Sequence, residues 1–284
     1  MRTACCLLFI FLLTCMFAVA QQPAATPVKP GKHVPEAKTH QEFNDYNAAY
    51  ALSGGAQMEK AADDFSAKYP ASELKAFLYA KALHEYQSEN NPGKMLAMGK
   101  KVLQFDPDNT IALVLTATVL ADGLDEKDPD RQQKIGDIKK DAERALATVD
   151  SSFTPPVNAT PEQITAYKKT LQSMAHSALG ITALKTNDDS TAERELKSAA
   201  ELNVTQPDPY IWYHLALAQD HLEKYPEALV SVNRALEYAG NSDLADLVRN
   251  ERKRLLMKNN LGGAEAPNQP PPAASPAAKP PSPK

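Results

Sequence analysis

The feature that most limits how this chain can fold is a pair of helix-length amphipathic segments between Asp208 and Leu236. Apolar residues recur every three or four positions in both segments, which predicts two helices with one apolar face each. A short turn containing Pro226 separates them. Large side chains of the first helix would face small ones of the second, so the two should pack as a pair. The residues on these faces are Trp212, Leu215, Ala216, Ala228, Val232 and Ala235.

The same arrangement recurs along the chain with a period of about 34 residues, which is the signature of a repeat architecture. One unit is longer, because an acidic insert over 123–133 and a Pro-containing break over 151–159 interrupt the register. Thr160 and Pro161 are typical of a helix start, and we expect one unusually long helix from there to Lys185. The predicted units span about 42–75, 76–109, 110–150, 173–206 and 209–242, followed by a capping helix over 243–259.

The residues in this register resemble the tetratricopeptide repeat (TPR) family in its secreted bacterial form. The 34-residue helix pair of that family has a W-x2-L-G start, and Trp212 with Leu215, and Leu179 with Gly180, occupy the corresponding positions. The resemblance implies an all-α fold: a right-handed α-α superhelix of about five helix pairs plus a capping helix, over residues 40–259. It also implies a protein–protein interaction scaffold that binds a peptide or protein segment in its concave groove.

In the TPR family the inner face of each first helix lines the groove. Carried over to this chain, that face is mostly apolar and aromatic, so we expect an apolar or amphipathic partner segment. The positions implied by the resemblance are Phe77, Ala80, His84, Ile111, Val114, Thr118, Met174, Ser177, Ile181, Tyr210, Tyr213 and Leu217. Within this set we assign the protein-binding groove to Phe77, His84, Val114, Ser177, Ile181, Tyr210, Tyr213 and Leu217.

Two residues of the repeat frame carry packing expectations. Trp212 should fill the space between its helix and the neighbouring helices, and we interpret it as a core residue. Gly99 stands where a larger residue is usual in the family, and we expect it to weaken packing locally.

Residues 1–20 predict a secretory signal peptide. Arg2 supplies a positive charge, an apolar stretch follows, and Ala18-Val19-Ala20 fits a cleavage site. An uncleaved membrane anchor is the alternative, and the segment ending at Cys15 faintly resembles a lipoprotein processing site. Membrane contact is expected only through such an anchor. We expect export across the inner membrane and a location in the bacterial periplasm or cell envelope.

Composition restricts the remaining possibilities. Residues 21–39 and 260–284 are rich in Pro and Ala and predict a disordered spacer and a disordered tail. The net charge of −4 gives no support for nucleic-acid binding. The 3 cysteines all lie within residues 1–20, so a cleaved chain has neither thiolate nor disulfide.

The sequence gives no positive sign of catalysis, and we predict no enzyme activity and no cofactor. None of the common hydrolase, metalloprotease or nucleotide-binding motifs occurs. His214 and His221 lie seven residues apart, which differs from a helical zinc site, and we predict no metal. Two alternatives to an interaction scaffold stay open. One is an envelope assembly or structural component tethered to membrane or wall, and the other is an enzyme or accessory domain with an unrecognised site.

Overall fold

The structure, a computed structural model, describes residues 35–155, 158–203, 207–240 and 242–261. Within these ranges the secondary structure is entirely helical, with 11 helices and no strand, which confirms the all-α prediction. The predicted signal peptide over 1–20 lies outside the described residues, as do residues 21–34 of the predicted spacer and 262–284 of the predicted tail.

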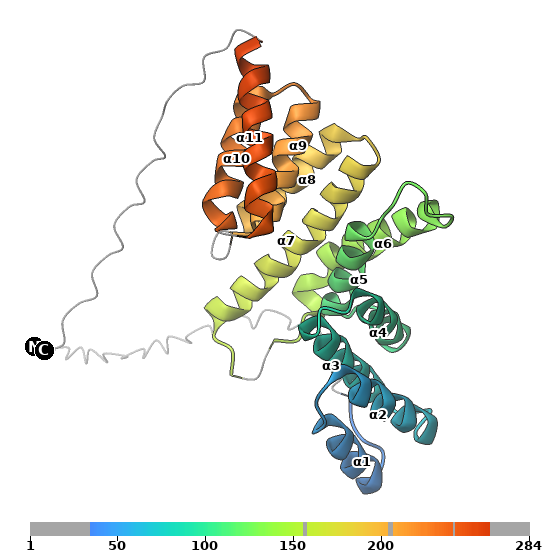
Figure 1. The fold of residues 1–284 in the computed structure, drawn as a ribbon. Helices are drawn as coiled ribbons and strands as arrows, with labels where there is room; N and C mark the ends of the chain where they lie inside the picture. The colour runs from blue at the N-terminus through green and yellow to red at the C-terminus, as the bar shows by residue number, and fades with distance from the viewer. Residues whose placement is uncertain (1–34, 156–157, 204–206, 241, 262–284) are drawn as a thin grey trace, which may run out of the picture. The chain divides into compact units, whose positions relative to one another are not determined.

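The helices follow one another in five pairs and end with a single helix, as the register predicts (Figure 1). They are α1 His40–Tyr50, α2 Gly55–Lys68, α3 Lys75–Ser88, α4 Pro92–Phe105, α5 Thr110–Asp122, α6 Arg131–Ser152, α7 Pro161–Lys185, α8 Asp189–Leu202, α9 Pro209–His221, α10 Tyr225–Ala239 and α11 Asp243–Leu261.

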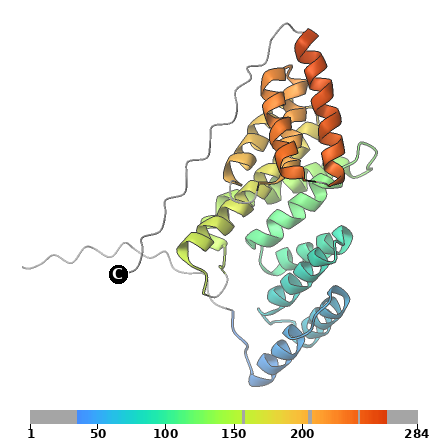
Figure 2. The same cartoon turned by 60° about the vertical axis from the view of Figure 1, so that its left-hand side comes forward.

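Each helix packs against the helix before it and the helix after it. Three first helices also touch the first helix of the next pair, since α1 contacts α3, α5 contacts α7 and α7 contacts α9. The terminal helix α11 packs mainly on α10, and both ribbon views show the two side by side (Figures 1 and 2). A repeat array is stabilised in this way, because each unit buries its apolar faces only against its neighbours.

Local sequence signals account for the helix ends. Thr160 and Gln163 form a capping box at the start of α7, where Gln163 N donates to Thr160 Oγ1 at 3.3 Å and Thr160 N donates to Gln163 Oε1 at 2.9 Å. The resulting helix of 25 residues ends at Lys185 as predicted. Between α1 and α2, Gly54 has a φ of +88°, a conformation that side-chain-bearing residues rarely adopt.

The buried apolar residues form three main clusters. The N-terminal core lies among α2, α3, α4 and α5, the central core among α5 to α9, and the C-terminal core among α9, α10 and α11. Met174 of α7 packs against both the N-terminal and the central core. Trp212 of α9 packs against the central and C-terminal cores and a small cluster around Ile211, which agrees with its predicted packing role.

Two glycines allow close contact between helices. A Cβ on Gly99 of α4 would lie 2.5 Å from the Oγ1 of Thr116 on α5, and a Cβ on Gly180 of α7 would lie 2.6 Å from the Cγ of Leu196 on α8. Our expectation that Gly99 weakens packing is therefore wrong. The missing side chain lets α4 and α5 approach more closely than any larger residue would permit.

None of the helices in the described ranges has both the length and the apolar character needed to cross a membrane.

Candidate protein-binding surface

The residues that we assigned to a groove fall on α3, α5, α7 and α9, the first helices of four pairs. Two aromatic residues of this set are open to solvent: 40% of Phe77 and 55% of Tyr210 is exposed. His84 is also exposed, and its Nδ1 lies 3.1 Å from Gln87 Oε1 on the same helix. These three side chains are available to a partner.

Val114 and Ile181 are not available, which corrects their assignment to the groove. Val114 is 0% exposed and Ile181 is 6% exposed, and both belong to the central core. The physical reason is that α5 and α7 have neighbours on several sides, since α5 contacts α4, α6 and α7, while α7 contacts α5, α6, α8 and α9. A residue on the inner face of such a helix is enclosed by its neighbours.

The other predicted residues, Ser177, Tyr213 and Leu217, are half-buried. Tyr213 packs against the C-terminal core, and its ring centre lies 5.7 Å from that of His214. Burial raises the pKa of Tyr213, and the carboxylate of Glu251 adds to this effect.

The exposed apolar side chains of the first helices follow the repeat. Phe43, Phe77 and Ile111 are each 34 residues apart, and Tyr210 holds the same second position in the fifth unit. Their exposed fractions are 51%, 40%, 44% and 55%. Met174 occupies this position in the fourth unit and is half-buried. We call Phe43, Phe77, Ile111 and Tyr210 the repeat-position residues.

Sequence reasoning missed the contribution of the first unit, although the register could have revealed it. Phe43, Tyr46 and Tyr50 hold the positions in α1 that Phe77, Ala80 and His84 hold in α3. They therefore lie along one face of α1 at i, i+3 and i+7. The ring centres of Tyr46 and Tyr50 are 5.5 Å apart. Burial raises the pKa of Tyr46 to about 12, and Tyr50 adds to the shift.

Between α1 and α3 this aromatic face borders a cavity of about 580 Å³. Its lining is mostly apolar, and it brings two repeat-position residues, Phe43 and Phe77, into one site. The lining residues are Pro35, Glu36, Ala37, Thr39, His40, Phe43, Tyr46, Leu74 and Phe77. Apolar walls with a few polar groups at the edge are typical of sites that bury a ligand side chain.

Hydrogen bonds fix the wall of this cavity. Thr39 caps α1, because its Oγ1 accepts a hydrogen bond from Glu42 N at 3.1 Å. Glu42 Oε2 in turn accepts a hydrogen bond from Lys38 N at 2.8 Å. The two bonds hold the chain that enters α1 against the helix, so this side of the cavity is formed without a partner.

The histidines that could have suggested a metal do not converge. Burial lowers the pKa of His214 to about 4 and keeps the ring neutral, while Nδ1 of His221 lies 2.8 Å from Asp189 Oδ1 at the start of α8. In the part of the chain that the structure describes, no group of three or more His, Cys, Asp or Glu side chains is placed to hold a metal.

No family model matches the chain, and no curated protein matches it. Solved structures do match. A thermophilic TPR protein, TTC0263, from Thermus thermophilus has 17% sequence identity, with 76% of this chain and 99% of that chain covered and a TM-score of 0.42. The MamA protein has 15% identity, with 66% and 93% covered and a TM-score of 0.39. The description of this chain as paired helices in a repeat rests on its own helices and register.

Proposed function

We propose that this chain is a protein-interaction scaffold that binds an apolar or amphipathic segment of a protein partner on its first helices. The observation that carries the proposal is the recurrence of an exposed large apolar side chain at one position of the repeat. Single exposed apolar residues are common on any protein surface. Their return at intervals of 34 residues, from Phe43 to Phe77 to Ile111, is not explained by chance exposure.

The aromatic cavity between α1 and α3 is the strongest part of this surface. Phe43 and Phe77 both line it, so one partner side chain could bury against two repeat-position residues at once. Burying a large apolar side chain stabilises a complex by roughly 1.5–3 kcal/mol. Aromatic residues in such a position commonly dominate the binding energy of an interface.

Site-specific photo-crosslinking tests the proposal. A photoreactive residue is placed at position 77 or 210 of the full chain, and the crosslinked partner is identified from envelope extracts by mass spectrometry. The matched control is position 230 on α10, because Val230 is 61% exposed but lies on a second helix. We expect the same partner at 77 and 210 and little crosslinking at 230. Equal yields at all three positions would argue against a first-helix surface.

Substitution provides an independent measurement. Phe43→Ser with Phe77→Ser should weaken capture of that partner about tenfold or more, while Val230→Ser should leave it unchanged. All three side chains are at least 40% exposed, so the melting temperature should change little in either variant. Loss of capture in the Val230→Ser control would indicate general misfolding rather than a specific surface.

A location in the periplasm or cell envelope is part of this proposal and rests on the sequence of residues 1–20. Cell fractionation with an antibody to the helical region tests it. Recovery of the chain in the cytoplasmic fraction alone would contradict it.

A further inference from the structure

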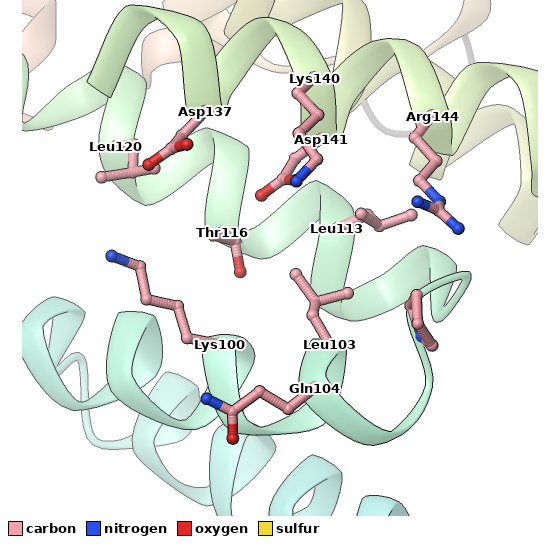
Figure 3. Close-up of a pocket in the computed structure, with 11 residues that line it drawn as sticks. Lys100, Leu103, Gln104, Leu113, Thr116, Leu120, Asp137, Lys140, Asp141 and Arg144 are labelled. Carbon is pink, nitrogen blue, oxygen red and sulfur yellow. The ribbon is translucent and has the colours of Figure 1, made fainter. Parts of the chain in front are cut away.

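A second cavity, of about 240 Å³, is lined by residues of α4, α5 and α6 and by none of the repeat-position residues (Figure 3). Leucines form its apolar side: Leu103 from α4, with Leu113 and Leu120 from α5. Pro107 and Thr116 also line it, and charged or polar side chains form the rest. They are Lys100 and Gln104 from α4, and Asp137, Lys140, Asp141 and Arg144 from α6.

The four charged residues of α6 are spaced at i, i+3, i+4 and i+7, so they lie along one face of that helix. Arg144 is engaged, because its Nε donates to Asp108 Oδ1 at 2.7 Å. The remaining charged residues of the cavity have no such partner within the part of the chain that the structure describes. Among the ion pairs and hydrogen bonds of the described residues, none involves a side chain of Lys100, Asp137, Lys140 or Asp141.

These unpaired charges are nevertheless close enough to influence one another. The pKa of Asp141 is raised to about 6, chiefly by burial, and the nearby carboxylate of Asp137 contributes to this rise. Lys140, Lys100 and Arg144 act in the opposite direction. Opposite charges therefore surround the cavity without direct contact, and Figure 3 shows Lys100 on the wall opposite Asp137 and Asp141.

The cavity also holds a buried hydroxyl without a partner. Thr116 is 2% exposed, and its Oγ1 makes no hydrogen bond. A threonine inside a helix ordinarily donates to the carbonyl four residues earlier. Thr182 does so, with Oγ1 2.7 Å from Ala178 O. The Oγ1 of Thr116 instead lies against Gly99 of α4, 2.5 Å from the position that a Cβ on that glycine would take, and Figure 3 shows it directed toward α4.

From this geometry we propose that the cavity binds a small zwitterion with a branched aliphatic side chain: a free α-amino acid such as leucine, or the N-terminal residue of a short peptide. The ligand carboxylate or carbonyl meets Lys100. The ligand ammonium lies between Asp137 and Asp141, and its side chain packs on the leucines. A simple anion would face two unpaired carboxylates, and a simple cation would face two lysines.

This site is independent of the first-helix surface, because its residues come from α4, α5 and α6 and include no repeat-position residue. A negative result for one proposal therefore does not affect the other. The volume of about 240 Å³ is below the usual range for drug-sized ligands, which agrees with a ligand of one residue.

Isothermal titration calorimetry on the full chain tests the site with four probes. L-leucine carries both charges, N-acetyl-leucine lacks the ammonium, leucinamide lacks the carboxylate, and the dipeptide Leu-Ala keeps the ammonium and moves the carboxylate away. We expect leucine to bind and N-acetyl-leucine to bind at least about tenfold more weakly, since the ammonium contact is lost. Leucinamide should be weakened as much if the ligand is a free amino acid, and should bind as well as Leu-Ala if the ligand is a peptide end. Tighter binding of Leu-Ala than of leucine would identify peptide ends as the source.

Two variants and two matched controls complete the test. Asp141→Asn and Lys100→Met should each weaken leucine binding about tenfold or more. Glu143→Gln and Lys139→Met change the same kinds of charge on the exposed face of α6 and should not alter binding. The proposal is overturned if leucine and Leu-Ala give no binding heat up to about 10 mM, or if the control variants weaken binding as much as the cavity variants.

Discussion

The carboxylate of Asp220 on α9 accepts a hydrogen bond from Lys258 Nζ on α11 at 2.8 Å, across 38 residues of sequence. Arg254 Nη2 donates to the same carboxylate at 2.5 Å. Only 3% of the Asp220 side chain is exposed. This buried carboxylate accepts hydrogen bonds from two cationic side chains of α11. It therefore links α11 to α9, in addition to the apolar contact between α10 and α11.

Asp220→Asn should destabilise the chain by about 2–3 kcal/mol, because the new amide presents N–H donors to cationic partners in a buried site. Burial acts to raise the pKa of Asp220, but hydrogen bonds from Lys258 and Arg254 outweigh it and the pKa lies below its ordinary value. The contribution of this carboxylate is therefore present above about pH 4 and is lost as pH falls further. Urea unfolding at pH 7 and pH 3 measures both effects.

The matched control for that variant is Asp246→Asn. Asp246 also pairs with an arginine of α11, Arg249, but 81% of its side chain is exposed. Solvent screens such a pair, so its loss should have little effect on stability. A loss as large as that of Asp220→Asn would show that burial does not explain the difference.

Gly180→Ala and Gly136→Ala should change stability in opposite directions. At Gly180 the added Cβ would lie 2.6 Å from Leu196 Cγ and 3.1 Å from Leu196 N, so α7 and α8 must separate. We expect a loss of about 1–3 kcal/mol. At Gly136, in α6, nothing lies within 4 Å, and alanine should stabilise the helix by up to about 1 kcal/mol. Thermal unfolding of the two variants, measured side by side with wild type, shows whether each substitution raises or lowers stability.

Asp141→Asn should stabilise the chain at neutral pH. Its carboxyl has a pKa of about 6 in the folded chain, chiefly because of burial, against an ordinary value of about 3.9. The folded state holds the proton more tightly, so wild-type stability falls as pH rises from about 4 to about 6. Asparagine removes this dependence and should add about 1 kcal/mol at pH 7, after allowance for solvent screening of a half-buried group.

The variant should differ little from wild type at pH 4, where the folded wild-type chain has already bound the proton and the unfolded chain is about half protonated. Glu143→Gln on the exposed face of α6 is the control, and its stability should follow wild type at both pH values. Unfolding curves from pH 4 to pH 8 distinguish the two variants. If the stability of Asp141→Asn changed with pH in parallel with that of wild type, the pH dependence could not be assigned to the Asp141 carboxyl.

Trp212→Ala should cost about 3–5 kcal/mol, because the indole packs against three buried clusters and a cavity would remain at their junction. Tyr210→Ala, two residues earlier, removes a side chain that is 55% exposed and should change the melting temperature little. When the two samples are equally folded, Tyr210→Ala should weaken partner binding more than Trp212→Ala does. Differential scanning calorimetry measures the first effect, and crosslinking yield measures the second.

The helix pairs could be predicted from sequence because their signals are local. The start of α7 depends on Thr160, Pro161 and Gln163, which lie within four residues of one another, and the cap forms as expected. Apolar periodicity likewise places Leu196 and Trp212 at packing positions without knowledge of distant contacts.

Exposure could not be predicted in the same way, because it depends on how many helices surround a given face. Val114 and Phe77 belong to the same predicted groove, yet one is fully buried and the other is 40% exposed. The link between Asp220 and Lys258 was equally hidden, since nothing near either residue identifies a partner 38 positions away. The second cavity requires side chains of α4 and α6 to face each other across α5, which the repeat register does not specify.

The length of α7 has a consequence for how the array comes apart. Repeat proteins commonly lose their terminal units first, because each unit depends only on its neighbours. Here a single uninterrupted helix of 25 residues carries Met174, which packs into two clusters at once. Melting that helix around Met174 removes a packed side chain from both clusters. Fraying from the ends should therefore stop at this helix, and the middle of the chain should lose its amide protection against hydrogen exchange in one cooperative step.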